Sequence, residues 1–287
     1  MKSIIPKTAA IHGITGFGRS SISVVIPVLS SMGIQVCPLP SALLSSHPGG
    51  FENYTFYVLT HEMEQSINCW EKENIKFDCI YSGFLGSAKQ AELVKRLIEN
   101  NDTKFIIVDP VMGDYGKLYK ITDKDMKKSM LSLVENAYVI TPNLTEACLL
   151  VGEDYDDKPL KLQRVKHLLK KLSDLGVANV VITGIRISDG DYGNYGYSRE
   201  NDSFWKVNYK HIPAQYPGTG DIFTSALTGY IIKGFDLPQA VSRASRFVSL
   251  AVEKTYLAKT PVREGILLEN ILPELNYKNS SDRGETI

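Results

Sequence analysis

The sequence predicts an α/β protein in which a doubly wound, mostly parallel β-sheet lies between helices on both faces, a three-layer sandwich. Two observations lead to this prediction. Short apolar runs rich in β-branched residues alternate along the chain with longer segments whose apolar residues recur at helical spacing. Such runs are typical of strands buried on both faces, and their alternation with helices is typical of βαβ units.

The predicted elements follow one another in a regular order. The runs expected to form parallel strands are residues 8–12, 34–39, 79–82, 105–108, 138–141 and 180–183. The helical segments among them are residues 20–32, 87–100, 124–135, 144–151 and 160–175. After Gly184, residues 194–198 and 204–209 predict an antiparallel hairpin that caps one sheet edge. Two strong helices follow at 219–233 and 238–254, and Asp236 suits the start of the second.

Composition limits the class of protein. The 287 residues are 43% hydrophobic and 22% charged, which is typical of a globular chain. We expect a single domain over residues 1–287, with a frayed polar tail at 278–287. The 32 basic residues balance 32 acidic ones, so neither nucleic acid nor a membrane is the expected partner. No apolar run is long enough to span a membrane.

The four cysteines are scattered along the chain and include no CxxC pair. This spacing argues against a zinc site and against a disulfide framework. A reducing compartment fits such cysteines, so we expect a cytoplasmic protein.

Two carboxylates follow the predicted strand at 105–108. Ligands of open parallel sheets bind beyond the carboxyl ends of the strands, so Asp109 and Asp114 lie where a ligand is expected. Such a pair suits Mg²⁺, held directly or through water. The plainer interpretation is that Asp109 caps a turn and Asp114 is solvated.

The next two strands also end in polar residues. Asn143 and Glu146 follow the strand at 138–141, at the edge where phosphate-bound metal is expected, although both also suit the start of a helix as N-cap and first-turn acid. Thr183 ends its strand beside Gly184, where a hydroxyl and a bare backbone suit a nucleotide phosphate or merely a turn.

The turn Gly218–Asp221, with sequence GTGD, directly precedes a strongly periodic apolar helix. The backbone N–H groups of Gly218, Thr219 and Gly220 can converge on an anion there, and the helix N-terminus adds positive partial charge. Asp221 then suits the base that accepts the proton of an attacking hydroxyl during phosphoryl transfer. A glycine turn with an acidic first-turn residue is the structural alternative.

Two other nucleotide sites are disfavoured. The chain has no GxxxxGK[ST] motif, which excludes a P-loop enzyme. The loop of residues 16–18 lacks the full GxGxxG pattern and its acidic partner, so binding of NAD is not expected.

Three motifs occur together in order: VDPVMGD at 108–114, TPNLTE at 141–146 and GTGD at 218–221. With them the chain resembles the ribokinase-like superfamily, and within it most closely the pyridoxal kinases. The segments YSGFLGS at 81–87 and 43–47, which contains Ser45 and ends at His47, extend the resemblance to about residues 8–255.

The resemblance implies an ATP-dependent kinase that phosphorylates the hydroxymethyl group of a vitamin B6 compound, with Asp221 as base. Asp109, Asp114 and Glu146 would form the Mg²⁺ and phosphate network, while Asn143 and Thr183 would face ATP. The resemblance further implies a mobile flap at 115–121 that includes Tyr119. It also implies activation by a monovalent cation such as K⁺, and a homodimer.

The sequence departs from this family on the substrate side. The resemblance places His12, Ser45, His47 and Phe84 around the acceptor. His12 stands where many pyridoxal kinases have serine and could hydrogen-bond a pyridine ring, although a lone histidine at a strand end is more often structural. Phe84 keeps an aromatic face without a hydroxyl, and proline replaces the threonine that commonly follows the family's histidine.

Three alternative functions remain open. Hydroxymethylpyrimidine kinases of thiamine synthesis share the motifs, but they typically carry cysteine after GTG, where this chain has Asp221. Sugar kinases of the same superfamily have substrate loops richer in Asn and Asp than residues 43–56. A non-catalytic carrier of a B6 vitamer is the third, motivated by the altered substrate side.

Overall fold

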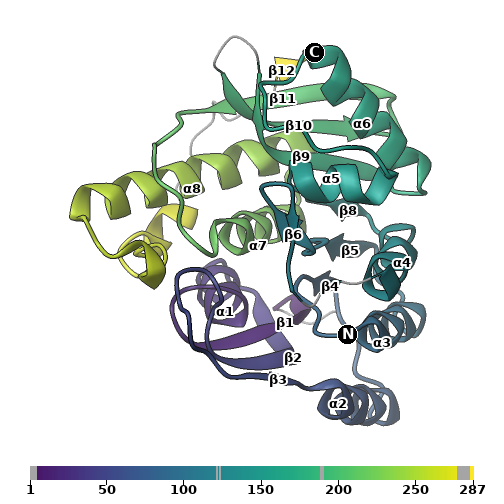
Figure 1. Ribbon diagram of the computed structural model, residues 1–287. Helices are drawn as coiled ribbons and strands as arrows, with labels where there is room; N and C mark the ends of the chain where they lie inside the picture. Colours follow the sequence, from purple (N-terminus) through teal and green to yellow (C-terminus); the bar gives the residue numbers. More distant parts are fainter. Residues whose placement is uncertain (1–4, 121, 123, 188–190, 277–284) are drawn as a thin grey trace.

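The structure is a computed structural model that describes residues 5–120, 122, 124–187, 191–276 and 285–287 (Figure 1). Its centre is a ten-stranded sheet. The strands are β1 (Lys7–Phe17), β2 (Gln35–Ser46), β3 (Phe56–Val58), β4 (Cys79–Ser82), β5 (Phe105–Val108), β8 (Val139–Ile140), β9 (Asn179–Arg186), β10 (Tyr192–Ser198), β11 (Ser203–Tyr209) and β12 (Glu285–Thr286). Two further short strands, β6 (Gly113–Asp114) and β7 (Lys117–Leu118), form a separate hairpin.

The strand order is β12-β11-β10-β9-β8-β5-β4-β1-β2-β3. All neighbours from β9 to β2 pair in parallel. The antiparallel strands β10, β11 and β12 complete one edge, and β3 completes the other. The carboxyl ends of the parallel strands therefore meet along one edge of the sheet, as expected for a doubly wound protein.

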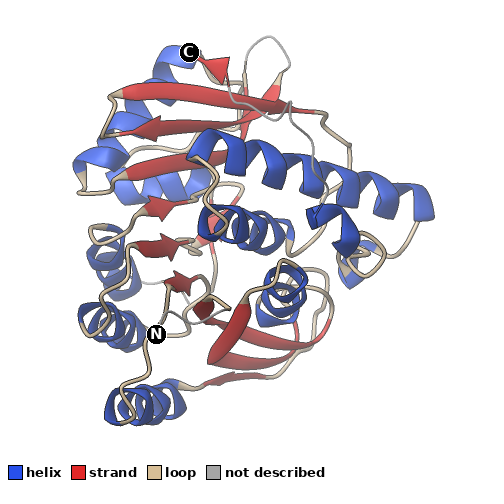
Figure 2. Cartoon of the chain, turned by 180° about the vertical axis from the view of Figure 1, so that it is seen from behind, coloured by secondary structure: helices blue, strands red, loops and turns tan. Residues whose placement is uncertain are grey.

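Helices cover both faces of the sheet (Figures 1 and 2). One face carries α2 (Thr60–Lys72), α3 (Ala88–Glu99), α4 (Lys124–Val134), α5 (Leu144–Val151) and α6 (Leu162–Asp174). The other face carries α1 (Ile22–Ser31), α7 (Thr219–Ile232) and α8 (Leu237–Ala258), together with the short helix η2 (Leu272–Asn276). Another short helix, η1 (Val262–Glu264), follows α8. The predicted three-layer sandwich is confirmed.

Strand β9 shows why the apolar runs predict buried strands. Val180 and Ile182 pack into the core beneath α2–α6, whereas Val181 between them packs into the core beneath α1, α7 and α8. Successive side chains of a strand point to opposite faces, so a strand covered on both sides must be apolar throughout.

The predicted helices and the hairpin at the sheet edge are present. Asp236 is the N-cap of α8, and its side chain accepts a hydrogen bond from the backbone N–H of Gln239 at 2.8 Å. The structure differs from these expectations in some elements: β1, β2 and β9 are longer than expected, residues 56–72 include β3 and α2, and the expected flap loop begins as the hairpin β6–β7. Most of the predicted frayed tail lies outside the described residues, but Glu285–Thr286 pair with β11 as β12.

Among the described residues, no helix is both long enough and apolar enough to cross a membrane.

Candidate active site

The GTGD turn forms the start of α7 at the carboxyl edge of the sheet. Gly218 is the N-cap and has φ of 82°, a left-handed conformation that favours glycine. A side chain there would also collide with the backbone, because an added Cβ would lie 2.1 Å from the carbonyl oxygen of Arg19. The backbone N–H of Ile222 is the first to bond back, to Gly218. The preceding N–H groups therefore have no partner within the helix and form a site suited to an anion.

Asp221 lies in the first turn of α7 and faces the start of α1. Its Oδ2 accepts a hydrogen bond from the backbone N–H of Ser21 at 2.8 Å, and its Oδ1 lies 3.7 Å from Nδ1 of His12. Burial raises the pKa of Asp221 to about 6, and the Ser21 N–H partly offsets this rise. A carboxylate with such a pKa is ionised at neutral pH and is a better proton acceptor than an exposed aspartate.

Three more carboxyl groups lie at this edge of the sheet, and one of them, Asp109, lies within the field of Asp221. Burial and then the charge of Asp221 raise the pKa of Asp109 to about 7. Burial and then the charges of Asp109 and Asp114 raise the pKa of Glu146 well above its usual value. Burial also raises the pKa of Asp114. The expected group of acidic residues is therefore assembled at the sheet edge, and a bound cation would relieve its repulsion.

The carboxyl groups fit a metal ion that brings other ligands with it. Within the ranges that the structure describes, no three His, Cys, Asp or Glu side chains form a metal-binding group by themselves. Each oxygen of Glu146 already accepts one backbone N–H group, from Met112 at 3.1 Å and from Asn143 at 3.0 Å, and keeps a further lone pair for a metal ion or a water molecule. Mg²⁺ commonly binds through one or two carboxylates, waters and phosphate oxygens, and this donor set suits such a complex.

Asn143 and Glu146 form a capping box at the start of α5, as the structural interpretation of the sequence expects. Oδ1 of Asn143 accepts the N–H of Glu146 at 2.9 Å, and Nδ2 donates to the carbonyl of Gly113 at 2.9 Å. Thr183 lies beside Asn143 in an isolated parallel bridge. Both residues are thus at the expected edge, although the side chain of Asn143 already has protein partners.

The hairpin β6–β7 lies next to the acidic group. The backbone N–H of Gly116 at its turn donates to Oγ1 of Thr145 on α5 at 2.9 Å. Tyr119 follows β7, and its N–H donates to the carbonyl of Met112 at 2.9 Å. Burial, and then the charges of Glu146 and Asp114, raise the pKa of the Tyr119 hydroxyl. The expected flap residue therefore lies within the field of the acidic group.

His12 lies beside Asp221, and Phe84 directly follows Gly83, which packs against the His12 ring. The ring of His12 is fully buried, and neither of its nitrogens has a hydrogen-bond partner among the described residues. Burial lowers the pKa of His12 to about 3, so the ring is neutral. An added Cβ on Gly83 would lie 2.0 Å from Cε1 of His12, so that position admits only glycine. The half-buried ring of Phe84 meets Phe56 edge-on, with 6.3 Å between the ring centroids.

His47 and Ser45 have contacts that differ from the expected role in binding an acceptor. Nε2 of His47 lies 2.8 Å from the carbonyl of Arg263, and Nδ1 accepts the N–H of Gly49 at 3.1 Å. Both ring nitrogens of His47 therefore have protein partners, which favours a structural role for this side chain over a direct hydrogen bond to the phosphoryl acceptor. Oγ of Ser45 accepts the N–H of Thr55 at 2.9 Å, and this hydroxyl keeps its O–H donor and one lone pair for a ligand.

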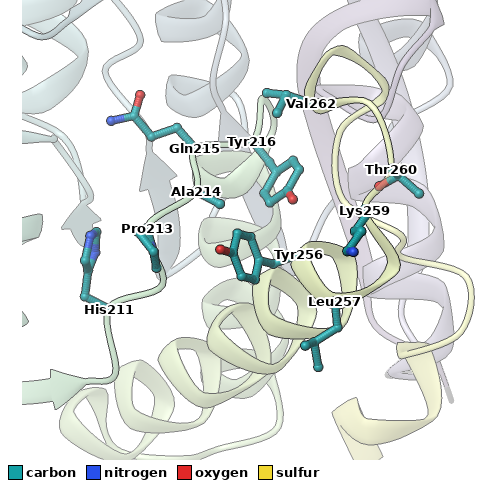
Figure 3. Close-up of a pocket in the computed structure, with 10 residues that line it drawn as sticks. All are labelled: His211, Pro213, Ala214, Gln215, Tyr216, Tyr256, Leu257, Lys259, Thr260 and Val262. Atoms are coloured by element: carbon teal, nitrogen blue, oxygen red, sulfur yellow. The ribbon is translucent and has the colours of Figure 1, made fainter.

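A cavity of about 720 Å³ lies beside the GTGD turn (Figure 3). Figure 3 shows Tyr216 and Tyr256 next to one another within it. Its lining comes from the loop before α7, the end of α8 and the segment that follows α8: His211, Pro213, Ala214, Gln215, Tyr216, Tyr256, Leu257, Lys259, Thr260 and Val262. Sequence reasoning missed this cavity, and also Ser21, because the contributing segments are far apart in the chain.

Fold and site together define a kinase of the ribokinase-like class. Residues 57–264 match the phosphomethylpyrimidine kinase family, and the chain belongs to it. Its members are phosphotransferases with an alcohol group as acceptor.

Three relatives illustrate the similarity. A candidate phosphomethylpyrimidine kinase from Bacteroides thetaiotaomicron, in a crystal form with pyridoxal, is 42% identical with a TM-score of 0.94, covering 99% of this chain and 100% of that one. A pyridoxine/pyridoxal/pyridoxamine kinase from Bordetella avium is 28% identical over 84% of this chain and 83% of its own length. A hydroxymethylpyrimidine/phosphomethylpyrimidine kinase from Bacillus subtilis is 29% identical over 64% of this chain and 66% of its own length.

Proposed function

We propose that the protein transfers the γ-phosphoryl group of ATP to the 5′-hydroxymethyl group of a B6 vitamer: pyridoxal, pyridoxamine or pyridoxine. The observation that carries this proposal is the position of Asp221. A buried carboxylate, held by the Ser21 N–H, adjoins the glycine turn at the N-terminus of α7. Base and anion site are therefore adjacent, as an in-line transfer to a hydroxyl requires.

The reaction assigns a separate task to each part of this site. The hydroxymethyl oxygen attacks the γ-phosphorus, its proton passes to Asp221, and the bond to the bridging oxygen of ADP breaks. The N–H groups at the start of α7 stabilise the negative charge on the transferring group. The flap around Tyr119 excludes water and so limits hydrolysis of ATP.

Asp109, Asp114 and Glu146 would hold Mg²⁺ with the phosphates, directly or through water. When bound, Mg²⁺ would neutralise phosphate charge and orient the donor. Asn143 and Thr183 are proposed to face the phosphates from the neighbouring strand ends. The proposal further includes a monovalent cation such as K⁺, a homodimer, a cytoplasmic location, and a single domain over residues 1–287.

The cavity beside Tyr216 suits the nucleoside of ATP. Its volume of about 720 Å³ falls in the range of small-molecule sites. Tyr216 directly precedes Pro217 and the glycine turn, so a base held there would direct its phosphates toward the anion site. Aromatic side chains such as Tyr216 and Tyr256 offer faces for stacking on a purine.

The acceptor is proposed to lie between Asp221, His12 and Phe84. The buried ring of His12 has both nitrogens free of protein hydrogen bonds in the described structure, so it can bind a polar atom of a heterocycle. Phe84 supplies an aromatic face for a pyridine ring. The relative crystallised with pyridoxal supports this choice of acceptor.

A second candidate acceptor is hydroxymethylpyrimidine. It carries a similar hydroxymethyl group on an aromatic ring, and the family match together with the Bacillus subtilis relative supports it. The Asp221 chemistry would be the same for either acceptor, so only comparison of substrates separates the two functions.

The Asp221→Asn variant tests the proposed role of the base. Turnover should fall about 10²-fold to 10⁴-fold, as expected for loss of general base catalysis. Binding of pyridoxal, measured by calorimetry, should stay within about threefold because the variant preserves shape. The exposed residue Asp102 supplies the matched control, Asp102→Asn. Undiminished turnover in Asp221→Asn would exclude this role. If the wild-type protein binds pyridoxal but phosphorylates no acceptor, the result would favour a carrier of the vitamer.

A further inference from the structure

We propose that His47 is a positioning residue for phosphoryl transfer: it holds the loop of residues 16–21, whose backbone in turn fixes the carboxylate of Asp221. The kinetic part of this inference rests on the proposed function, whereas its structural part does not.

His47 joins two distant parts of the chain. Its imidazole is 4% exposed, and its Nε2 lies 2.8 Å from the carbonyl oxygen of Arg263. Because a carbonyl only accepts, Nε2 carries the hydrogen and Nδ1 is the acceptor for the N–H of Gly49. One neutral tautomer therefore links the segment after β2 to the segment after α8.

The loop of residues 16–21 packs directly against this ring. Gly18 has φ of 91°, and an added Cβ would lie 2.5 Å from Cδ2 of His47. Phe51 contacts both the loop and His47. Its ring is edge-on to Phe17, with 5.7 Å between the ring centroids, and edge-on to His47, with 5.2 Å between them. The guanidinium of Arg263 lies 5.5 Å from the Phe51 ring centre. Movement of His47 would therefore remove the contacts of this loop on the side that faces away from Asp221.

The inner side of the same loop contacts the catalytic turn. The carbonyl of Arg19 occupies the space that a side chain on Gly218 would need, and the N–H of Ser21 donates to Asp221 at 2.8 Å. Ser21 has φ of 53° and ψ of −137°, a conformation that non-glycine residues rarely adopt. Such strain persists only where surrounding contacts maintain it. The hydrogen bond to Asp221 therefore depends on the contacts that hold the loop.

A second anchor acts on the loop from the same C-terminal region. Nε of Arg19 lies 2.8 Å and 3.1 Å from the two carboxylate oxygens of Glu269, and its NH1 donates to the carbonyl of Glu264 at 3.1 Å. The side chain of Arg19 is 27% exposed, so its replacement disturbs less of the core than replacement of His47. It offers an independent way to loosen the loop.

The kinetic test compares His47→Asn with His47→Gln. Gln can place a donor near the position of Nε2 and keep the link to Arg263, whereas Asn is too short. We expect kcat to fall about tenfold to hundredfold in His47→Asn, since small misplacement of a catalytic group has effects of this size. His47→Gln should recover most of the loss, and KM for the vitamer should stay within about threefold in both variants.

Matched controls separate this effect from general damage. His167→Gln removes a histidine of α6 that hydrogen-bonds Glu153, and the kcat of this variant should be unchanged. If His47→Asn does not fold, Arg19→Gln should give the same fall in kcat without a rise in KM. A direct acceptor contact by His47 predicts the opposite pattern, in which KM rises in both His47 variants, and that result would overturn the proposal.

Hydrogen exchange supplies a readout that needs no substrate. In the ligand-free protein, peptides that cover residues 16–23 should exchange at least about tenfold faster in His47→Asn than in the wild type, and as in the wild type in His167→Gln. Unchanged exchange there would overturn the proposed link. If the wild type phosphorylates no acceptor, the proposed function fails, while the exchange result still decides whether His47 holds the loop.

Discussion

Replacement of Asp109 by Asn should stabilise the ligand-free protein at alkaline pH. Burial and the charge of Asp221 raise the pKa of Asp109 from 3.8 to about 7. Between these two values the native state keeps a proton that the unfolded state has lost. The free energy of unfolding therefore falls as pH rises through this range, and the loss is complete above pH ~7.

The size of the effect follows from the two pKa values. Each pKa unit corresponds to about 1.4 kcal/mol, so ionising Asp109 in the native state costs up to about 4 kcal/mol. Asn cannot ionise, and its neutral side chain also spares Asp221 a nearby charge. We expect the free energy of unfolding of Asp109→Asn to exceed that of the wild type by roughly 2–4 kcal/mol at pH 8. At pH 5 the excess should be less than half as large, because only part of the range between the two pKa values has then been crossed.

Urea unfolding of the metal-free and nucleotide-free protein at pH 5 and pH 8 measures this difference. Asp102→Asn, which removes an exposed carboxylate, is the matched control and should follow the wild type at both values. An Asp109→Asn variant with no gain at pH 8, or with the same gain at pH 5, would refute the electrostatic reasoning.

Three substitutions, with Gly220→Ala as a control for the first, test other parts of the site. Gly218→Ala should destabilise the protein by about 1–3 kcal/mol, because the backbone there is left-handed and a carbonyl group lies next to it. Gly220→Ala, which has open space at its Cβ, should unfold like the wild type. Equal urea midpoints for the two variants would contradict this. Asn143→Ala should cost about 1 kcal/mol through loss of the α5 cap, and an unchanged unfolding free energy would exclude that role. Thr145→Val removes the acceptor of the Gly116 N–H and should raise KM for ATP about fivefold; a constant KM would show that this bond does not hold the flap.

The parts of the molecule that sequence predicts are those set by local chemistry. The parallel strands could be predicted because strands covered on both faces must be apolar, and the GTGD turn because glycines before a periodic helix suit an anion. Asp109, Asp114 and Glu146 could be placed together because each follows a strand end at the same sheet edge.

The parts that could not be predicted depend on contacts between distant segments. Ser21 and Asp221 are 200 residues apart, and nothing local marks the N–H of Ser21 as a partner for the base. The Gly16-Phe17-Gly18 loop is an incomplete nucleotide motif, and the sequence does not show what else its last glycine does. In the structure Gly18 makes room for His47, which is distant in the chain. Residues 56–72 were missed as β3 and α2 because β3 is very short and depends on pairing with β2.

The central claim is tested most directly by a comparison of phosphoryl acceptors. Phosphorylation of pyridoxal, pyridoxamine, pyridoxine and hydroxymethylpyrimidine is measured side by side. Each reaction contains ATP, Mg²⁺ and K⁺, and a control lacks any acceptor. The proposed function predicts that kcat/KM is highest for a B6 vitamer and that ATP is stable without an acceptor. A higher kcat/KM for hydroxymethylpyrimidine, or no product from any B6 vitamer, would contradict it.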